Sequence, residues 1–405
     1  MSKLIYTSFS PNTRLKDYLL NWNLLFKPWA VNKGPYSKLV ESIFEQKFPE
    51  SKAYTFNLAR SGMHVLFKSL NLEPKSEIIV QGFTCIAAIN PILWAGLKPV
   101  YCDINKATLN LDIELLKTKI TSQTRAIMFQ HTFGNSAGIQ EVSKLCEENN
   151  ILLIEDCTNT VFGKHHEQLQ GGFGDASIFS FGRDKAVSGV SGGLILINNR
   201  KLVESFEQLY KKIKHPSTGW TYSQLIYPLV WQEIKFGFSM HPAIGKLAHA
   251  CATKLKLISR ATTKKEKQAQ PEKNRWNLLP NALAQLAHTQ LKDIDILNSH
   301  RIDLGDIYKQ NAKTSLVTFE EGNVPLRYPI LLKDKAQTLK TLRSRHIYLG
   351  DWYDNPITPI STDYEKIGYI VGSCPNSEEI CKGIANLPTH INITHEDAHK
   401  ILNAL

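Results

Sequence analysis

The chain has 405 residues, 42% of them hydrophobic, and a formal charge of +11. This length fits two domains or one large domain with a sizeable core. Its seven cysteines are scattered without a C-x-x-C pair, which disfavours a disulfide framework and fits reduced thiols. The first residues lack the apolar core of a signal peptide, and no run approaches a membrane span, so we expect a soluble cytoplasmic protein.

Short apolar runs and helical patterns alternate along the first half of the chain. A helix is expected to follow the small residues Ser61-Gly62, where free N–H groups of a first turn suit an anion, although an ordinary N-cap serine is the simpler explanation. Strands are expected at 77–80, 99–102, 126–130 and 151–154, and helices at 39–48, 84–95 and 139–149. This alternation is typical of a largely parallel sheet with helices on both faces. A P-loop motif is absent.

The stretch from Ile151 to Gly193 contains the residues best suited to chemistry. Its first apolar run ends on Glu155-Asp156, a glycine-rich turn follows at 171–174, and a second apolar run precedes Lys185. Ligands of open α/β sheets bind beyond the carboxyl ends of the strands. The stretch therefore predicts a ligand site with one carboxylate and one lysine.

A lysine and a carboxylate at strand ends suit an aldehyde cofactor. A lysine amine forms a Schiff base with an aldehyde, and pyridoxal phosphate (PLP) also needs an acid for its ring nitrogen and a phosphate cradle. Lys185 and Asp156 can meet the first two needs, and Ser61, Gly62 and Ser180 the third. Taken singly, Asp156 could instead cap a helix and Lys185 could lie on the surface, so the hypothesis depends on the combination.

Residues 201–275 interrupt the alternation. They hold fourteen basic and five acidic residues, a net +9, together with aromatic residues in short apolar bursts. Such a composition indicates a membrane surface or a phosphate-rich ligand. The alternative is a solvated helical insertion whose aromatic residues pack on the main body. The charged end of this segment, 254–273, is expected to be mobile.

The last third of the chain predicts a smaller α+β domain. Helical periodicity covers 281–297, and strands are expected at 328–332 and 347–349. Residues 395–399 match the zinc motif H-E-x-x-H, but only six residues follow, which leaves no third ligand. Thr394 and Asp397 also fit a capping box, so we expect a helix start and no metal.

Several segments together resemble the DegT/DnrJ/StrS-type family of PLP-dependent sugar aminotransferases. The resemblance covers 55–200 and 276–400, and its motifs are ARSGMHVL, NNILLIEDC, GGFGDASIFSFGRDK and the closing PNSEEICKGIANLPTH. It implies an α/β protein of PLP fold type I, the aspartate-aminotransferase-like fold. The implied parts are a large cofactor domain at 1–200, a basic insertion at 201–275 and a small C-terminal domain at 276–405.

The resemblance also implies roles for individual residues. Lys185 matches the Schiff-base lysine, and Asp156 matches the acid on the pyridine nitrogen. Asn159 stands where the family usually has a glutamine near the phenolic oxygen, and Ser180 matches a phosphate-binding serine. The backbone of Gly62 and Met63, next to Ser61, matches the other half of the phosphate cradle. 

Three further features of the resemblance concern the partner subunit and the substrate. Asn277 matches an asparagine that reaches the phosphate of the partner subunit, which implies a homodimer with shared sites. Met63 replaces a usual threonine, and Cys85 replaces a usual aromatic residue that stacks on the cofactor, with Phe83 as a substitute ring. The segment 201–275 is longer and more basic than usual, so the substrate of a known member does not transfer.

These features favour transfer of an amino group from glutamate to a nucleotide-linked keto-sugar, with the basic segment meeting the diphosphate. One alternative is a PLP-binding regulator without turnover, suggested by Met63 and Cys85. A PLP-dependent dehydratase is disfavoured because such members replace the lysine with histidine. Another alternative is an enzyme that docks at the inner membrane through 219–260 and acts on a lipid-linked sugar. No nucleic-acid partner is expected.

Overall fold

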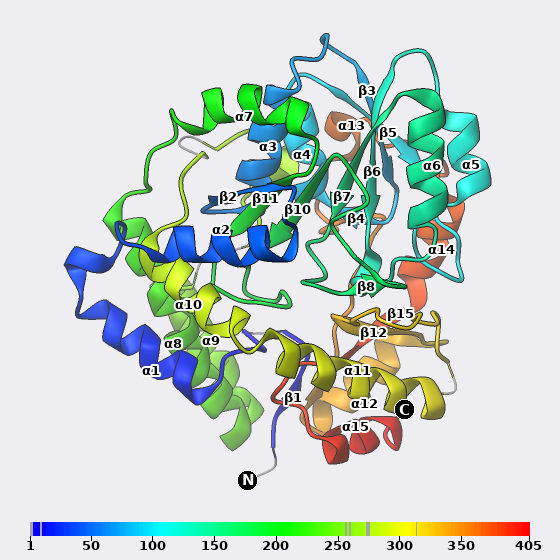
Figure 1. Ribbon diagram of the computed structural model, residues 1–405. Helices are drawn as coiled ribbons and strands as arrows, with labels where there is room; N and C mark the ends of the chain where they lie inside the picture. Colours follow the sequence, from blue (N-terminus) through cyan, green and yellow to red (C-terminus); the bar gives the residue numbers. More distant parts are fainter. Residues whose placement is uncertain (1–2, 9, 256, 259–260, 273–275, 313) are drawn as a thin grey trace.

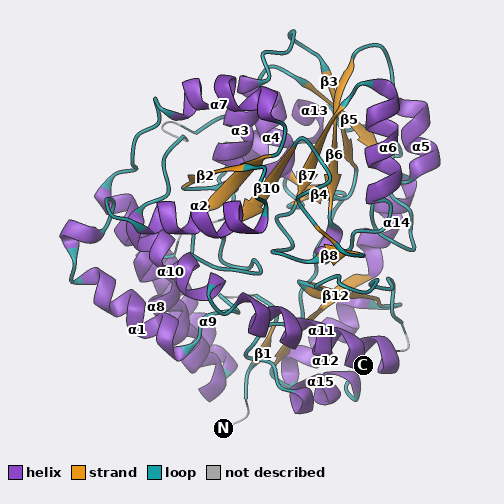
Figure 2. Ribbon diagram, in the orientation of Figure 1, coloured by secondary structure: helices purple, strands orange, loops and turns teal. Residues whose placement is uncertain are grey.

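The computed structural model describes residues 3–8, 10–255, 257–258, 261–272, 276–312 and 314–405. A central seven-stranded sheet lies between two layers of helices (Figure 2). Its strands, in spatial order, are β2 (Lys52–Phe56), β11 (Gly193–Ile197), β10 (Ala176–Ser180), β7 (Leu152–Asp156), β6 (Thr124–Gln130), β3 (Glu77–Gln81) and β5 (Lys98–Cys102). Only β11 runs antiparallel to its neighbours within this sheet, so the predicted, mostly parallel α/β fold is confirmed.

The strands are apolar on both faces, which explains why helices cover both. Along β3, Ile78 and Val80 pack into one core cluster while Ile79 packs into another. One face is covered by α3 (Ala59–Ser69), α4 (Ile86–Trp94) and α7 (Val203–Tyr210). The other is covered by α2 (Tyr36–Lys47), α5 (Ile113–Lys119), α6 (Ile139–Asn149) and α10 (Asn281–Leu291) (Figure 1).

A second, smaller core lies below the sheet in Figure 1. It joins two strand pairs to three helices: β12 (Arg327–Leu331) with β15 (Ile384–Pro388), β1 (Ile5–Tyr6) with β13 (Ile347–Tyr348), and α11 (Ile294–Asn311), α12 (Lys335–Ser344) and α15 (His395–Leu402). The capping box at Thr394 and Asp397 is present at the start of α15, as predicted. 

The division into 1–200, 201–275 and 276–405 stays a prediction, and two strand pairings cross it. The N-terminal β1 pairs with β13 of the small core, and β14 (Ile357–Thr358) pairs with β4 (Thr84–Cys85) at the sheet. The remaining elements are short or peripheral: α1 (Leu15–Leu25), η1 (Pro28–Ala30), η2 (Thr132–Gly134), β8 (Lys164–His165), β9 (Gln168–Leu169), η3 (Arg200–Leu202), η4 (Glu266–Gln268), α13 (Tyr364–Ile367) and α14 (Pro375–Gly383).

The basic segment forms α7 and a helical hairpin of α8 (Thr218–Met240) and α9 (Pro242–Lys254). Tyr227 and Trp231 of α8 are buried against the main body, as the insertion interpretation expects. The mobility predicted for 254–273 stays a prediction, although Glu266 within it is buried and pairs with Arg60 at 2.7 Å. Residues 256, 259–260 and 273 of that expectation lie outside the described residues.

None of the helices in the described part of the chain is long and apolar enough to cross a membrane.

The burial of Lys235 in α8 gives a pH-dependent prediction. Its Nζ lies 3.4 Å from the Tyr6 hydroxyl, and burial lowers the pKa of Lys235 from 10.5 to about 8. The unfolded chain therefore binds this proton more tightly, and the folded state loses stability as pH falls from 10.5 to 8. Lys235→Met should raise the free energy of unfolding at pH 7 by up to about 3 kcal/mol.

Urea unfolding of this variant at pH 7 and at pH 10 checks the prediction, with the exposed Lys68→Met in α3 as the control. The gain should shrink at pH 10, where less of the penalty remains. A gain of equal size at both values of pH would show that lost charge burial is not its cause.

Candidate active site

The two carboxylates at the end of β7 face opposite sides of the sheet. Ile154 packs in the cluster under α3 and α4, and side chains alternate along a strand, so Asp156 points to that side and Glu155 to the other. The register pairs Asp156 with Ile178 of β10, which places Ser180 two residues further along on the same side. Asp156 and Ser180 thus share one end and one face of the sheet.

Glu155 fixes the loop that follows β9. Its carboxylate accepts N–H bonds from Gly171, Phe173 and Gly174 at 2.7–2.8 Å, and it lies 2.8 Å from the ring of His131. Cys157 lies close enough to complete a three-ligand group for a metal ion. The Glu155 oxygens already have these partners, and burial raises the pKa of the Cys157 thiol well above its usual value, so the group is structural.

Lys185 lies within hydrogen-bond reach of the loop after Asp156. Its Nζ donates to the Thr158 hydroxyl at 3.2 Å, and the Thr158 N–H donates to Asp156 Oδ1 at 2.9 Å. Burial lowers the pKa of Lys185 below its usual value, and the nearby Asp156 carboxylate opposes this shift. The predicted lysine and acid therefore meet at one buried place.

The loop that carries Lys185 is held from two distant parts of the chain. Asn12, in the N-terminal segment, donates to the carbonyl oxygens of Lys185 and Ala186, the latter at 3.0 Å. Arg301 of α11 is buried and donates to Asn12 Oδ1 at 2.8 Å. The position of the lysine therefore depends on the small core as well as on the sheet.

The first turn of α3 lies over the end of β10, but it begins earlier than expected. α3 starts at Ala59, so Ser61 and Gly62 lie inside the helix, and their N–H groups approach the Leu58 carbonyl at 3.0 and 3.3 Å. The predicted turn before the helix is wrong, because Ser61 and Gly62 lie within α3 and their N–H groups donate to the Leu58 carbonyl. The close approach is real: a Cβ on Gly193 would lie 2.3 Å from Ala59 Cα.

The other predicted cradle residues have clear positions. The Ser180 hydroxyl accepts the N–H of Gly182 at 3.3 Å and is half-buried. The Met63 side chain is buried in the cluster under α3, so it adds packing there. Asn277 is buried, and its carbonyl accepts the N–H of Asn57 at 2.9 Å. Its reach into a partner subunit stays a prediction.

Cys85 lies at the start of α4, where its sulfur accepts the Ala87 N–H at 3.5 Å, and burial raises the pKa of its thiol. The aromatic ring near Cys85 belongs to Tyr353: burial, followed by the charges of Cys85 and Asp156, raises the pKa of this phenol. The Tyr353 ring stacks on Phe133 at 5.8 Å and meets the edge of Phe83 at 5.0 Å. Tyr353 could not be predicted as a site residue, because no periodic pattern surrounds it in the sequence.

Asn159 and Arg327 complete the polar lining. Asn159 is buried, and its side chain hydrogen-bonds to the Tyr353 phenol, which partly offsets the effect of burial on the pKa of that phenol. Arg327, at the start of β12, is buried with its guanidinium 3.6 Å from the centre of the Trp352 ring. Its charge lowers the pKa of Lys185, and burial lowers its own. In the sequence, Arg327 stood out only as a charged residue immediately before the predicted strand at 328–332.

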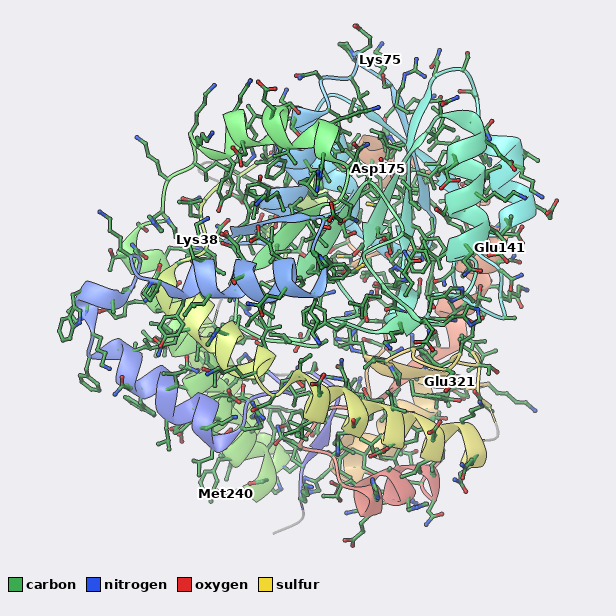
Figure 3. The ribbon with its side chains drawn as sticks, in the orientation of Figure 1. Lys38, Lys75, Glu141, Asp175, Met240 and Glu321 are labelled. Atoms are coloured by element: carbon green, nitrogen blue, oxygen red, sulfur yellow. The ribbon has the colours of Figure 1, made fainter. Side chains whose placement is uncertain are left out.

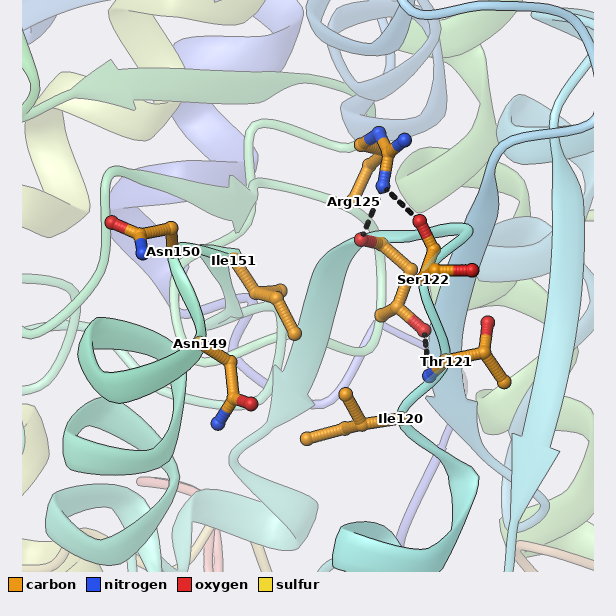
Figure 4. A pocket seen from close by; sticks show the side chains of 8 residues that line it. Ile120, Thr121, Ser122, Arg125, Asn149, Asn150 and Ile151 are labelled. Atoms are coloured by element: carbon orange, nitrogen blue, oxygen red, sulfur yellow. Dashed lines mark hydrogen bonds between the residues drawn. The ribbon is translucent and has the colours of Figure 1, made fainter.

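One hollow on the surface lies elsewhere. It has a volume of about 470 Å³ and is lined by residues such as Ile120, Arg125 and Asn150 (Figure 4). These residues lie at the amino ends of β6 and β7, the opposite end of the sheet from Asp156. Arg125 donates to the carbonyls of Ser122 and Thr124 of its own loop, so the hollow offers no convergent ligand groups.

Comparison with known proteins identifies relatives of this fold and sequence. The family model described as DegT/DnrJ/EryC1/StrS aminotransferase family matches residues 23–271 and 244–405. A GDP-perosamine synthase of Vibrio cholerae is 30% identical over 176 residues, which is 44% of this chain and 48% of that protein, so the match spans about half of the relative's length.

Two solved structures share the fold over nearly the whole chain. PseC of Helicobacter pylori, an aminotransferase of pseudoaminic acid biosynthesis, superposes with a TM-score of 0.73 at 20% identity and covers 99% of this chain and 98% of its own. Spr1654 of Streptococcus pneumoniae, in its PLP form, superposes with a TM-score of 0.73 at 18% identity over 97% and 95% of the chains. These likenesses confirm the predicted aspartate-aminotransferase-like architecture.

Glu155 gives a prediction about how the site is held. Glu155→Gln removes the charge that three N–H donors share and turns an amide N–H₂ toward one of them. We expect the free energy of unfolding to fall by about 3 kcal/mol or more. Urea unfolding measures the change, with the exposed Glu148→Gln of α6 as the control. A loss no larger than that of the control would mean that the loop does not depend on Glu155.

Proposed function

Since the chain belongs to the DegT/DnrJ/EryC1/StrS aminotransferase family, we propose that it is a PLP-dependent aminotransferase. The proposed reaction moves an amino group from glutamate to a keto-sugar carried by a nucleotide. The observation that carries the proposal is the half-buried Lys185, whose Nζ reaches Thr158 at 3.2 Å while Thr158 bonds Asp156. These residues lie beyond the carboxyl ends of β7 and β10, where α/β folds bind ligands.

The residues present fit PLP. Lys185 supplies the amine, Asp156 the acid for the ring nitrogen, Ser180 a hydroxyl for the phosphate, and Asn159 a buried side-chain amide next to Tyr353. When bound, PLP supplies an electron sink for negative charge that develops at the substrate carbon. The Spr1654 structure, which shares the fold, is described in a PLP form, which supports the same cofactor here.

The chain's own residues hold and move protons. Burial lowers the pKa of Lys185, which favours the neutral amine that can accept a proton from the substrate at Nζ and return it to the substrate carbon. Thr158 holds Nζ in place from the loop that it shares with Asp156. Asp156 is 3% exposed, so its carboxylate can keep a ring nitrogen protonated with little screening by water.

Arg327 supports an amino-acid donor. Its planar guanidinium stacks on Trp352, and Nη2 donates to the Asp184 carbonyl at 3.3 Å. A guanidinium has five N–H donors in a fork that matches a carboxylate, so most of them remain for a ligand. A buried cation next to Lys185 needs an anion nearby, and the α-carboxylate of glutamate meets that need.

The acceptor and the oligomeric state have separate support. The relative from Vibrio cholerae is named a GDP-perosamine synthase, and the net charge of +9 over 201–275 suits a diphosphate. Homodimer formation, with Asn277 directed at the phosphate site of the partner subunit, is part of the proposal. A PLP-binding regulator without turnover is the rival, and turnover separates the two.

The main test is spectroscopic. Wild-type protein mixed with PLP should develop a visible absorption band that glutamate bleaches, and a nucleotide keto-sugar should restore it. Lys185→Ala should lack the band, because Lys185 is the lysine whose Nζ bonds the Thr158 hydroxyl next to Asp156. Lys212→Ala, an exposed change, serves as the control. A bleachable band in Lys185→Ala would assign the amine elsewhere, and a band without turnover would favour the regulator.

Arg327→Lys tests the donor site while keeping the charge. Lysine cannot form the bidentate, stacked contact, so the KM for glutamate should rise at least tenfold while the KM for the keto-sugar stays nearly unchanged. Steady-state kinetics with each substrate varied in turn give both values, and Arg125→Lys in the distant hollow is the control. Equal changes in both constants would remove Arg327 as the carboxylate site.

A further inference from the structure

Exposed apolar side chains are concentrated on one flank of the molecule. Among the described residues, eleven of the nineteen large hydrophobic side chains that are exposed belong to α1, η1, α8, α9 and the residues just after α9. We call this set the apolar flank: Leu15, Leu19, Trp22, Phe26, Trp29, Phe236, Met240, Ile244, Leu247, Leu255 and Leu257. Figure 1 shows α1, α8 and α9 side by side at the lower left.

The spacing of these residues places them on continuous helix faces. In α1, the residues at 15, 19, 22 and 26 follow an i, i+4, i+7, i+11 pattern, which lies on one side of a helix. Leu15 and Phe26 are each 73% exposed, and Trp29 of η1 is 75% exposed. Residues 244 and 247 of α9 and Leu255 at its C-cap have the spacing i, i+3, i+11, which also keeps them on one side of a helix, and Met240 lies at the outer end of α8 (Figure 3).

The opposite faces of the same helices pack against the rest of the protein. The apolar flank is therefore the outer side of helices that are held in place. In α1, Asp17 and Leu24 are buried, and Arg14 pairs with Asp293 at 2.7 Å. The α8–α9 hairpin closes tightly, because a Cβ on Gly237 would lie 3.2 Å from Gly245 Cα. These helices keep their exposed apolar faces while burying the other side.

The charge around the flank is almost entirely positive. Lys16, Lys27 and Lys33 are exposed near α1, and Lys246 and Lys254 are exposed on α9. In the described parts of 14–33 and 218–258, the acidic residues are the buried Asp17 and the exposed Glu233. Such a surface is complementary to negative charge.

We propose that the apolar flank docks this protein on a membrane surface rich in anionic lipids. Tryptophan, phenylalanine and leucine side chains would enter the boundary between headgroups and acyl chains, and the lysines would contact anionic headgroups. Exposed aromatic residues bordered by lysines suit this boundary better than the less charged centre of an interface between proteins.

The loops near β14 are better suited than the apolar flank to bind a second copy of the chain. Ile360, Ile370 and Val371 are each more than 70% exposed on loops near β14, and β14 pairs with β4 beside Cys85. A dimer that shares active sites needs contacts near the site, and these loops offer apolar ones. The apolar flank is therefore left for the lipid surface.

Co-sedimentation of the full chain with vesicles tests the proposal without any substrate, so the outcome is independent of the proposed reaction. Wild-type protein should bind vesicles that contain phosphatidylglycerol and should bind pure phosphatidylcholine at least tenfold more weakly. The double variant Phe26→Glu/Trp29→Glu should lose at least 90% of binding. Lys246→Gln/Lys254→Gln should weaken it about fivefold or more, and high salt should have the same effect.

Leu115→Glu/Ile296→Glu is the matched control, because both residues are exposed and apolar but lie off the flank. It should bind vesicles like the wild type, and thermal melts should show that every variant is folded. Absence of wild-type binding, or equal losses in the flank and control variants, would overturn the proposal. So would a dimer-to-monomer change in Phe26→Glu/Trp29→Glu by light scattering, since the flank would then be a protein interface.

Discussion

The site depends on the two adjacent carboxylates at the end of β7. Because side chains alternate along a strand, Glu155 and Asp156 point to opposite faces of the sheet. Glu155 gathers three backbone N–H groups and His131, so its negative charge is fully used in holding a loop. Asp156 keeps a free oxygen on the face where Lys185 and Ser180 lie. One pair of like residues thus divides into a structural and a chemical role.

Much of this could be predicted from sequence, since it depends on local patterns. Alternating strands and helices predicted the parallel sheet, and the acidic pair and Lys185 marked the strand ends. The start of α3 could not be placed exactly, because Ala59 and Arg60 enter the helix before the small residues that looked like a turn. Arg327 and Tyr353 were missed because their burial near Lys185 results from contacts between segments more than 140 residues apart.

The lysine loop explains why these distant segments matter. Its backbone is bound by Asn12, which is bound in turn by Arg301, and both belong to parts that pack around the small core. A movement of the small core would therefore move Lys185 relative to Asp156, which is fixed in the sheet. Precise placement of the Lys185 amine therefore depends on distant segments, although the predicted acid and lysine both lie within residues 151–193.

The segment 201–275 faces both the site and the surface. Through Glu266 it pairs with Arg60 in the first turn of α3, and the carbonyl of Glu266 accepts from Asn90 of α4 at 2.9 Å. Through α8, α9 and the residues just after α9 it contributes six of the eleven residues of the apolar flank. The charges of Arg60 and Glu266 also act on Cys85, so this segment borders the candidate site. Residues 201–275 would then have two roles for an acceptor delivered at a lipid surface. Their helices α8 and α9 would bind the lipid, and the part around Glu266 would form one side of the site.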